Sequence, residues 1–157
     1  MEKAYSIRRA TPEDAPGILD CLRRAFTPYR ESYTAAAFTD TVLTPEAFEK
    51  RQSEMRILVA ADATNRIIGT IAYRASNGEG YIRGMAVWPE HQGRGVARAL
   101  LGQAESDLRE LDCRAVTLDT TRPLRRAMRF YERSGFRQTG EISSFFGMDL
   151  VAYQKEL

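Results

Sequence analysis

The sequence contains few of the residues that build metal sites and disulfide frameworks. It has two cysteines, Cys21 and Cys113, and a single histidine, His91. The wide separation of the cysteines fits no zinc-binding spacing, and one pair cannot form a disulfide framework. We expect both to be small buried hydrophobic residues in a reducing compartment. One histidine is too few for a histidine-based metal site, so no metal is expected.

Long hydrophobic runs and a strong excess of one charge are also missing. The longest clean apolar run covers residues 57–61, far short of the roughly 18 residues that a membrane span needs. The N-terminal segment MEKAYSIRRATPED has no apolar core of signal-peptide length. The 23 basic and 21 acidic residues leave a net charge of +2, which is small for a nucleic-acid-binding domain. We therefore expect a soluble, cytoplasmic protein that binds neither nucleic acid nor membrane.

The length and overall composition are those of one ordinary folded domain. The chain has 157 residues, of which 43% are hydrophobic and 28% charged, so it is neither disordered nor of low complexity. No internal repeat, charge block or Ser/Gly/Pro linker divides it. A single domain spanning residues 1–157 is expected, long enough to fold without a metal or disulfide.

Hydrophobic periodicity and turn residues predict alternating strands and helices. The segment 27–43 is aromatic and is expected to be irregular. Helices are predicted after Thr11-Pro12, from Thr44-Pro45 to about residue 54, and over residues 95–111 and 123–134. Strands are predicted over residues 4–9, 56–61, 67–75, 81–87, 115–120, 136–143 and 146–154. This order indicates an α/β or α+β fold in which helices cover a mixed sheet.

A short glycine-containing loop links the predicted strand 81–87 to the helix that follows it. Pro89 stops the strand, and Gly93 and Gly95 precede the helix. The first N–H groups of a helix lack intrahelical partners, so they can bind a phosphate wherever glycine lets it approach. An ordinary tight turn explains the same residues equally well. No Gly-Lys-Ser/Thr phosphate loop is present, and Arg98 replaces the small residue of a dinucleotide fingerprint.

Two segments together resemble the GNAT superfamily of N-acetyltransferases. QGRGVA at residues 92–97 is similar to its Gln/Arg-x-x-Gly-x-Gly/Ala signature, and AMRFYERSGF at residues 127–136 is similar to its Ala-x-x-x-Tyr-Glu-x-x-Gly-Phe segment. The predicted order of elements resembles the family over nearly the whole chain. The resemblance implies a mixed, mostly antiparallel seven-stranded sheet, flanked by four helices and splayed between its fourth and fifth strands.

The resemblance further implies that acetyl-CoA, as co-substrate, binds between the strands 81–87 and 115–120. Its pyrophosphate would meet the N–H groups of the loop, its pantetheine arm would pair with residues 85–87, and the N–H of Val87 would hold the thioester oxygen. One departure is Leu124, which stands where many members carry an asparagine that contacts CoA. The implied cofactor-binding residues are Met85, Ala86, Val87, Gln92, Gly93, Arg94, Gly95, Val96, Ala97, Arg98 and Tyr131.

The family motif also implies catalytic roles. Tyr131 would be the general acid that protonates the departing thiolate, although its helical spacing also suits a core tyrosine. Glu79 and Tyr81 are candidates for the base that deprotonates the amine, and Glu79 also fits an ordinary turn acid. The implied reaction is direct attack of a primary amine on acetyl-CoA in a ternary complex. A non-catalytic acyl-CoA-binding sensor is the alternative from another class.

The acceptor would lie against the first helices and the last hairpin. We predict contacts from Tyr29, Arg30, Tyr33, Arg83 and Phe146. These aromatics suit a small amine with an apolar body, and Arg30 or Arg83 suits a carboxylate on it; core or dimer contacts are the other interpretation. A small-molecule amine is preferred to a peptide or protein amine, because nothing acidic lines this region. Homodimerisation is left open.

Overall fold

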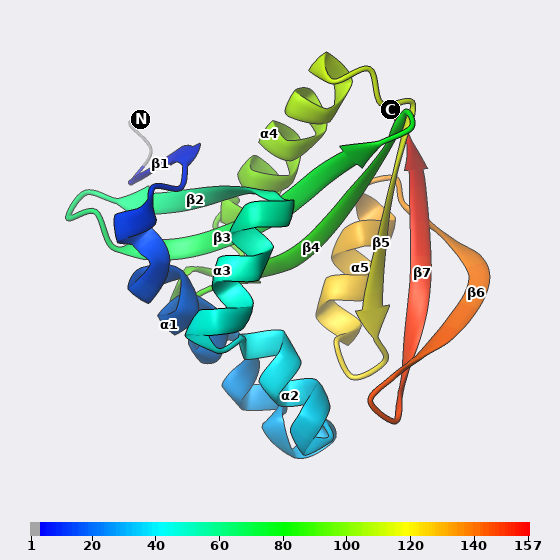
Figure 1. The fold of residues 1–157 in the computed structure, drawn as a ribbon, viewed down its shortest axis with the longest axis horizontal. Helices are drawn as coiled ribbons and strands as arrows, with labels where there is room; N and C mark the ends of the chain where they lie inside the picture. The colour runs from blue at the N-terminus through cyan, green and yellow to red at the C-terminus, as the bar shows by residue number, and fades with distance from the viewer. Residues whose placement is uncertain (1–3) are drawn as a thin grey trace.

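The structure is a computed structural model that describes residues 4–157. Residues 1–3, part of the segment tested above for a signal peptide, lie outside the described residues. Figure 1 shows one twisted sheet with helices on both of its faces. The elements are β1 (Tyr5–Arg9), 3-10 helix η1 (Pro12–Asp14), α1 (Ala15–Phe26), 3-10 helix η2 (Thr27–Ser32), α2 (Ala35–Val42), α3 (Pro45–Glu54), β2 (Arg56–Asp62), β3 (Ile67–Ser76), β4 (Glu79–Val87), 3-10 helix η3 (Pro89–His91), α4 (Val96–Glu110), β5 (Ala115–Thr121), α5 (Arg125–Arg133), β6 (Arg137–Phe145) and β7 (Met148–Glu156).

The sheet has seven strands in the order β1-β2-β3-β4-β5-β7-β6. Every neighbouring pair is antiparallel except β4 and β5, which run parallel. That parallel pairing extends only from Glu79 opposite Ala115 to Ile82 opposite Leu118. Beyond it the two strands diverge, as Figure 1 shows. The mostly antiparallel seven-stranded sheet, splayed between its fourth and fifth strands, is therefore confirmed.

The splay coincides with a bulge in β4. Arg83 pairs with Ala72 and Ala86 pairs with Thr70, so two residues of β4 lie opposite one residue of β3. One of the two is Gly84, whose φ of +65° is a left-handed conformation that glycine adopts readily. A bulge bends its strand and increases the local twist. The end of β4 is consequently turned away from β5.

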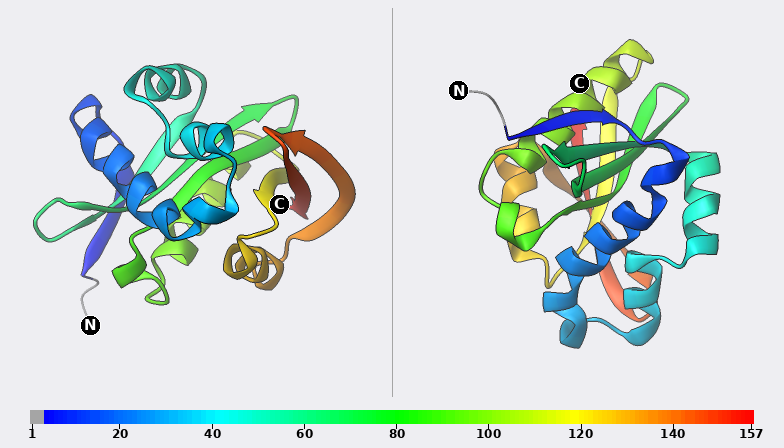
Figure 2. Two further views of the ribbon diagram at one scale, coloured as in Figure 1. Left: turned by 90° about the horizontal axis from the view of Figure 1, so that it is seen from below. Right: turned by 90° about the vertical axis from the view of Figure 1, so that its left-hand side faces the viewer.

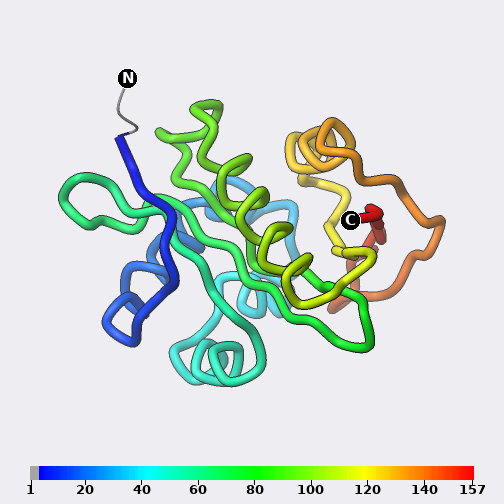
Figure 3. Tube along the Cα trace, turned by 90° about the horizontal axis from the view of Figure 1, so that it is seen from above, coloured from blue at the N-terminus to red at the C-terminus, as the bar shows by residue number. Residues whose placement is uncertain are grey.

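Helices cover both faces of the sheet. In Figure 2, α1 to α3 lie on one side of the strands and α4 and α5 on the other, and Figure 3 shows the same layers from the opposite end. Strand β2 contributes to both cores: Val59 packs in the cluster with α1 and α3, and Leu58 packs in the cluster with α4. Burial on both faces explains why residues 57–61 are apolar without alternation. Within residues 4–157, no helix is long and apolar enough to cross a membrane.

The segment 27–43 differs from the prediction. It forms η2 and α2, so residues 4–157 contain five α-helices rather than four. The N-cap of α2 is Thr34, whose hydroxyl accepts a hydrogen bond from the N–H of Ala37 at 3.1 Å. The helix ends at Leu43, which has a φ of +66°. Eight residues are too few for a clear hydrophobic period. In this aromatic segment, Thr34 was not recognised as an N-cap.

Candidate functional site

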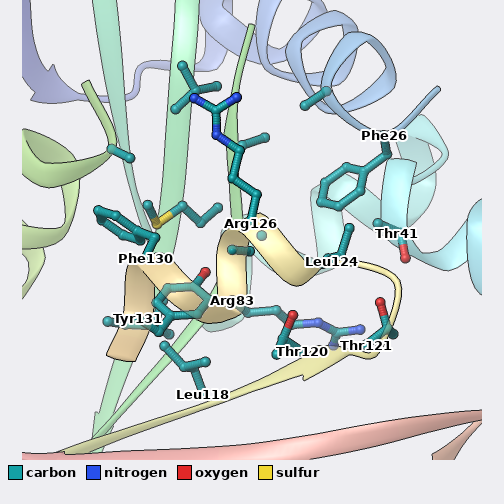
Figure 4. Close-up of a pocket in the computed structure, with 18 of the residues that line it drawn as sticks. Phe26, Thr41, Arg83, Leu118, Thr120, Thr121, Leu124, Arg126, Phe130 and Tyr131 are labelled. Carbon is teal, nitrogen blue, oxygen red and sulfur yellow. The ribbon is translucent and has the colours of Figure 1, made fainter. Parts of the chain in front are cut away.

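The divergence of β4 and β5 opens a cavity of about 850 Å³. It lies beyond the last paired residues of the two parallel strands, where open sheets commonly bind their ligands. Figure 4 shows side chains from α1, β4, β5 and α5 around this space. Its walls come from α1 to α3, β4, the loop before α4, β5, α5 and the hairpin of β6 and β7. Segments from both halves of the sequence thus surround one cavity.

The glycine loop forms one end of the cavity. Gly93 and Gly95 have φ angles of +78° and +86°. The first hydrogen bond of α4 runs from the N–H of Ala99 to the carbonyl of Gly95, at 3.0 Å. The N–H groups of residues 96–98 therefore have no partner within the helix. With the positive end of the helix dipole, these donors create an environment that favours an anion.

Most of the predicted cofactor residues line this cavity. Gln92 holds the loop against the end of β4, because its side-chain amide donates to the carbonyl of Val87 at 3.1 Å. The lining includes Met85, Ala86, Val87, Gln92, Gly93, Gly95, Ala97, Arg98 and Tyr131. The side chains of two further predicted residues lie elsewhere, although the contact predicted for both is through the backbone. Val96 is buried in the core, and Arg94 lines a separate cavity of about 520 Å³ beside Tyr5.

The backbone on either side of Arg94 explains where its side chain lies. Left-handed glycines on both sides of Arg94 turn the chain, so that its side chain leaves the main cavity. Val96, in the first turn of α4, faces the sheet and packs near Gly69. Only the backbone N–H of either residue remains available for the predicted phosphate contact.

Tyr131 is buried at the centre of an aromatic cluster and still borders the cavity. Its ring centroid lies 5.6 Å from that of Phe130, 5.8 Å from Phe136 and 6.3 Å from Tyr153. Burial raises the pKa of its phenol, so the hydroxyl stays protonated at neutral pH. Within residues 4–157 no hydrogen bond satisfies this hydroxyl, although the residue lines the cavity. A protonated donor is thus available to a ligand, and both sequence interpretations, core residue and site residue, fit this position.

The two candidate bases lie in different surroundings. Tyr81 lines the cavity, and its hydroxyl donates to Asp119 Oδ2 on β5 at 3.3 Å. Burial, and then the negative charge of Asp119, raise the pKa of Tyr81. Glu79 is exposed at the start of β4, opposite Ala115, where the two strands are still paired. Glu79 does not line the cavity, which opens at the other end of β4, and its role as a base stays a prediction.

At the far end of the cavity, three of the five predicted acceptor residues are present. Tyr29, Tyr33 and Arg83 line it. The hydroxyls of Tyr33 and Thr121 are 2.6 Å apart, which joins the segment before α2 to the end of β5. Arg83 Nη2 donates to Asp40 Oδ2 of α2 at 2.7 Å, so this pair connects β4 to the helical side.

Arg30 and Phe146 do not line the cavity, and their contact with an acceptor stays a prediction. The guanidinium of Arg30 lies over the ring of Phe38, 5.2 Å from its centroid. Phe146 is 53% exposed in the turn between β6 and β7, with a φ of +50°. Phe145, the last residue of β6, lines the cavity, and its ring centroid lies 5.1 Å from that of Phe146.

Several cavity residues had not been expected from the sequence. Three polar residues follow the last residue of β5 that pairs with β4: Asp119, Thr120 and Thr121. A polar run at the end of a strand could have indicated a binding site from the sequence. His91, expected at the surface, also borders the cavity. The other unpredicted members include Phe26, Asp40, Thr41, Arg51 and Phe130; Leu124, Arg126 and Arg133 of the family's second motif region also line the cavity.

Neither cysteine belongs to this site. Cys21 and Cys113 are buried, as expected, and do not line the cavity. Burial raises the pKa of Cys21 to about 12, which leaves its thiol un-ionised and unreactive. Among residues 4–157, no three His, Cys, Asp or Glu side chains gather as a metal site would require.

Comparison with known proteins identifies a family. The family model described as "Acetyltransferase (GNAT) family" matches residues 17–136. Streptothricin acetyltransferase of Streptomyces lavendulae is 30% identical over 108 residues, which cover 68% of this chain and 53% of that protein. Mycothiol acetyltransferase of Propionibacterium freudenreichii subsp. shermanii is 33% identical over 84 residues, covering 51% of this chain and 27% of that protein. The matches thus extend over about half, or less, of each curated relative.

Solved structures share the fold over the whole chain. The PaiA N-acetyltransferase of Thermoplasma acidophilum, solved in complex with coenzyme A, superposes with a TM-score of 0.79. The superposition covers 99% of this chain and 100% of that one, at 19% sequence identity. An identity this low shows the common fold alone.

Proposed function

This chain belongs to the GNAT family of acetyltransferases, and we propose that it transfers the acetyl group of acetyl-CoA to the primary amine of a small molecule. One observation carries the proposal. A single cavity extends from the anion-favouring loop, past the buried phenol of Tyr131, to the end that is lined by Tyr29, Tyr33 and Arg83. The names of two relatives, acetyltransferases of streptothricin and mycothiol, favour a small-molecule acceptor.

The loop and the free edge of β4 fit the two ends of acetyl-CoA. The unpartnered N–H groups of residues 96–98 suit the pyrophosphate, and the nearby guanidinium groups of Arg98 and Arg126 suit additional phosphate charge. Residues 83–87 have no partner on β5, so their edge is open to an extended amide chain such as pantetheine. The solved relative in complex with coenzyme A is consistent with this assignment.

The N–H of Val87 suits the thioester oxygen. The adjoining Trp88 N–H donates to Ile68 of β3 at 2.8 Å. Successive N–H groups of an extended strand point to opposite edges, so the Val87 N–H faces the cavity, which Val87 also lines. A fixed donor at that position stabilises the negative charge that develops on the carbonyl oxygen during attack.

In the proposed reaction the amine nitrogen attacks the thioester carbonyl carbon, a C–N bond forms and the C–S bond breaks. Tyr131 donates its proton to the departing sulfur, which leaves as the CoA thiol. The amine releases one proton, and the cavity wall offers Asp119, which accepts a hydrogen bond from the hydroxyl of Tyr81, whereas Asp40 is paired with Arg83. We assign Asp119 and Tyr81 to that proton, through water. Attack is direct, since neither cysteine reaches the cavity.

The Tyr131→Phe variant tests the assignment. Because the phenol contributes to the chemical step, kcat is expected to fall by about 10²–10⁴-fold while acetyl-CoA affinity changes little. The matched control is Tyr73→Phe, which removes a tyrosyl hydroxyl that donates to Asp107 outside the cavity. Thiol release across a pH series and calorimetric titration with acetyl-CoA measure both quantities, with ATP and dephospho-CoA as controls. Parental turnover in Tyr131→Phe would refute the general-acid role.

The same measurements separate the enzyme from the alternative binding module. An acyl-CoA sensor needs the loop and the open edge of β4, but not a protonated donor at the sulfur. Saturable acetyl-CoA binding without thiol release, for every amine tested, would support the sensor. Absence of acetyl-CoA binding would contradict both functions and leave only the fold.

A further inference from the structure

Arg51 is a buried cation on the cavity wall. It lies on α3, is only 9% exposed, and packs against the β4 bulge. A Cβ placed on Gly84 would come 2.6 Å from Arg51 Nη1, so the guanidinium occupies the space that this glycine leaves. The bulge that separates β4 from β5 therefore also makes room for the arginine.

The carboxylates of Asp40 and Glu54 act on this guanidinium only through space, without a direct contact. Among residues 4–157, no hydrogen bond or ion pair is formed by the Arg51 side chain. The nearest acid on the same wall is Asp40, and its carboxylate is already paired with Arg83 at 2.7 Å. Burial, and then the positive charge of Arg83, lower the pKa of Arg51 to about 10. Buried charges are normally paired, so an unpaired guanidinium that faces a cavity favours the binding of an anion there.

The charges on this wall can be counted. On the lining, Arg51 and Arg83 carry two positive charges and Asp40 carries one negative charge, while Glu54, which also acts on Arg51, is exposed and lies outside the lining. The neighbouring lining is apolar and aromatic, with Phe26 on α1 and Tyr29 on η2. Figure 4 shows Phe26 and Arg83 on different sides of the same space. One anionic group attached to an apolar body would satisfy both features.

We propose that Arg51 and Arg83 bind an acidic group of the acceptor, so that the substrate carries both a primary amine and a carboxylate or phosphonate. This inference rests on the proposed function and deepens it. A guanidinium presents its donors as a planar fork that matches two oxygens of such a group. Arg83 immediately precedes Gly84, and the free edge of β4 continues to Val87, so an acid bound there holds its amine beside the proposed thioester site.

Substrates matched in shape but not in charge test the proposal. L-Phenylalanine and 1-amino-2-phenylethylphosphonic acid carry the anion, and L-phenylalaninamide and 2-phenylethylamine do not. We expect wild-type kcat/KM to favour the anionic pair by at least about tenfold. Arg51→Met should lower kcat/KM for the anionic pair by about 10–100-fold and leave the neutral pair nearly unchanged. Comparing the carboxylate with the phosphonate identifies which acid is preferred.

Controls separate charge from shape. Arg51→Lys keeps the charge without the fork and should lie between wild type and Arg51→Met. Arg23→Met removes an exposed arginine of α1 that does not line the cavity, and it should behave as wild type. Equal use of anionic and neutral amines by the wild type would overturn the proposal while leaving the acetyltransferase function intact. Failure of the proposed function would instead appear as absent acetyl-CoA binding.

A binding measurement makes the test independent of turnover. Protein saturated with CoA, which occupies the phosphate loop, is titrated with methylphosphonate and with succinate, small anions that fit whatever the acceptor's shape. Saturable binding to wild type that Arg51→Met abolishes would support the proposal. Absence of saturable binding of either anion to CoA-loaded wild type would overturn it.

Discussion

Arg51→Met should make the ligand-free protein more stable. Burial, more than the charge of Arg83, lowers the pKa of Arg51 from its ordinary value to about 10 in the folded chain. At about 1.4 kcal/mol for each pKa unit, burying this charge costs on the order of 3 kcal/mol. Methionine preserves most of the apolar stem, and imperfect repacking costs about 1 kcal/mol. The free energy of unfolding should therefore rise by about 2 kcal/mol, which is roughly 4–8 °C in Tm for a chain of this length.

The sign of the pH dependence follows from the lowered pKa. The folded state disfavours the charged form, so the penalty is complete below about pH 10 and is relieved as the pH rises toward 12.5. At pH 7 the stabilisation by Arg51→Met should consequently be at its full size. Urea and thermal unfolding, followed by circular dichroism, measure it directly. Arg51→Lys, which retains a buried cation, is the matched control and should not be stabilised.

Two outcomes would refute this reasoning. If Arg51→Met unfolds at a lower temperature than wild type, the guanidinium makes a favourable contact in the folded protein and is not an unpaired charge. If methylphosphonate raises the Tm of CoA-saturated wild type and of CoA-saturated Arg51→Met equally, the anion binds away from Arg51. The expected pattern is a rise for wild type alone, because only the wild-type protein presents the buried fork.

Two further predictions concern other parts of the molecule. Gly95→Val should weaken acetyl-CoA binding. The control is Gly140→Val, at a φ of +89° on β6, which has a similar backbone cost of about 1–2 kcal/mol but lies away from the loop. Equal acetyl-CoA affinity in both variants would contradict the phosphate assignment. Hydrogen bonding from Arg8 lowers the pKa of Asp14 to about 2, so this pair should contribute about 2 kcal/mol that is present above pH 4 and lost as the pH falls toward 2. In Asp14→Asn the free energy of unfolding should not show that loss at acid pH. Asp20→Asn, which removes the acid of an exposed pair, should lose stability with acid as the wild type does. An acid unfolding transition of Asp14→Asn identical to that of the wild type would exclude the contribution.

The strands and the long helix could be predicted because their signals are local. Turn residues delimit each strand, and the apolar residues of α4 recur at helical spacing. The two motifs were recognisable for the same reason, since each is contiguous and occupies one loop or one helix. Whether Tyr131 is a core or a site residue could not be decided from its spacing. The structure shows that its ring packs in the core while the residue also borders the cavity.

The acceptor side could not be predicted because it depends on tertiary register. Glu79 and Tyr81 lie two residues apart on the same face of β4, yet only Tyr81 reaches the cavity. The difference is the point at which β4 leaves β5, which no residue in β4 alone reveals. Similarly, Arg51 belongs to PEAFEKRQSE, a strongly polar helix in which any charged residue is expected to face water. Its burial follows from the position of α3 over the bulge.

Gly84 connects the two halves of the proposed site. Its left-handed φ permits the bulge that opens the sheet for a cofactor, and its missing Cβ admits the guanidinium of Arg51. A buried, unpaired charge lowers the stability of the free protein, so it should be retained only where it contributes to binding. The same backbone irregularity therefore creates the space for the acyl donor and positions the charge that we propose selects the acceptor. On this reasoning, donor binding and acceptor choice depend on one distortion of β4.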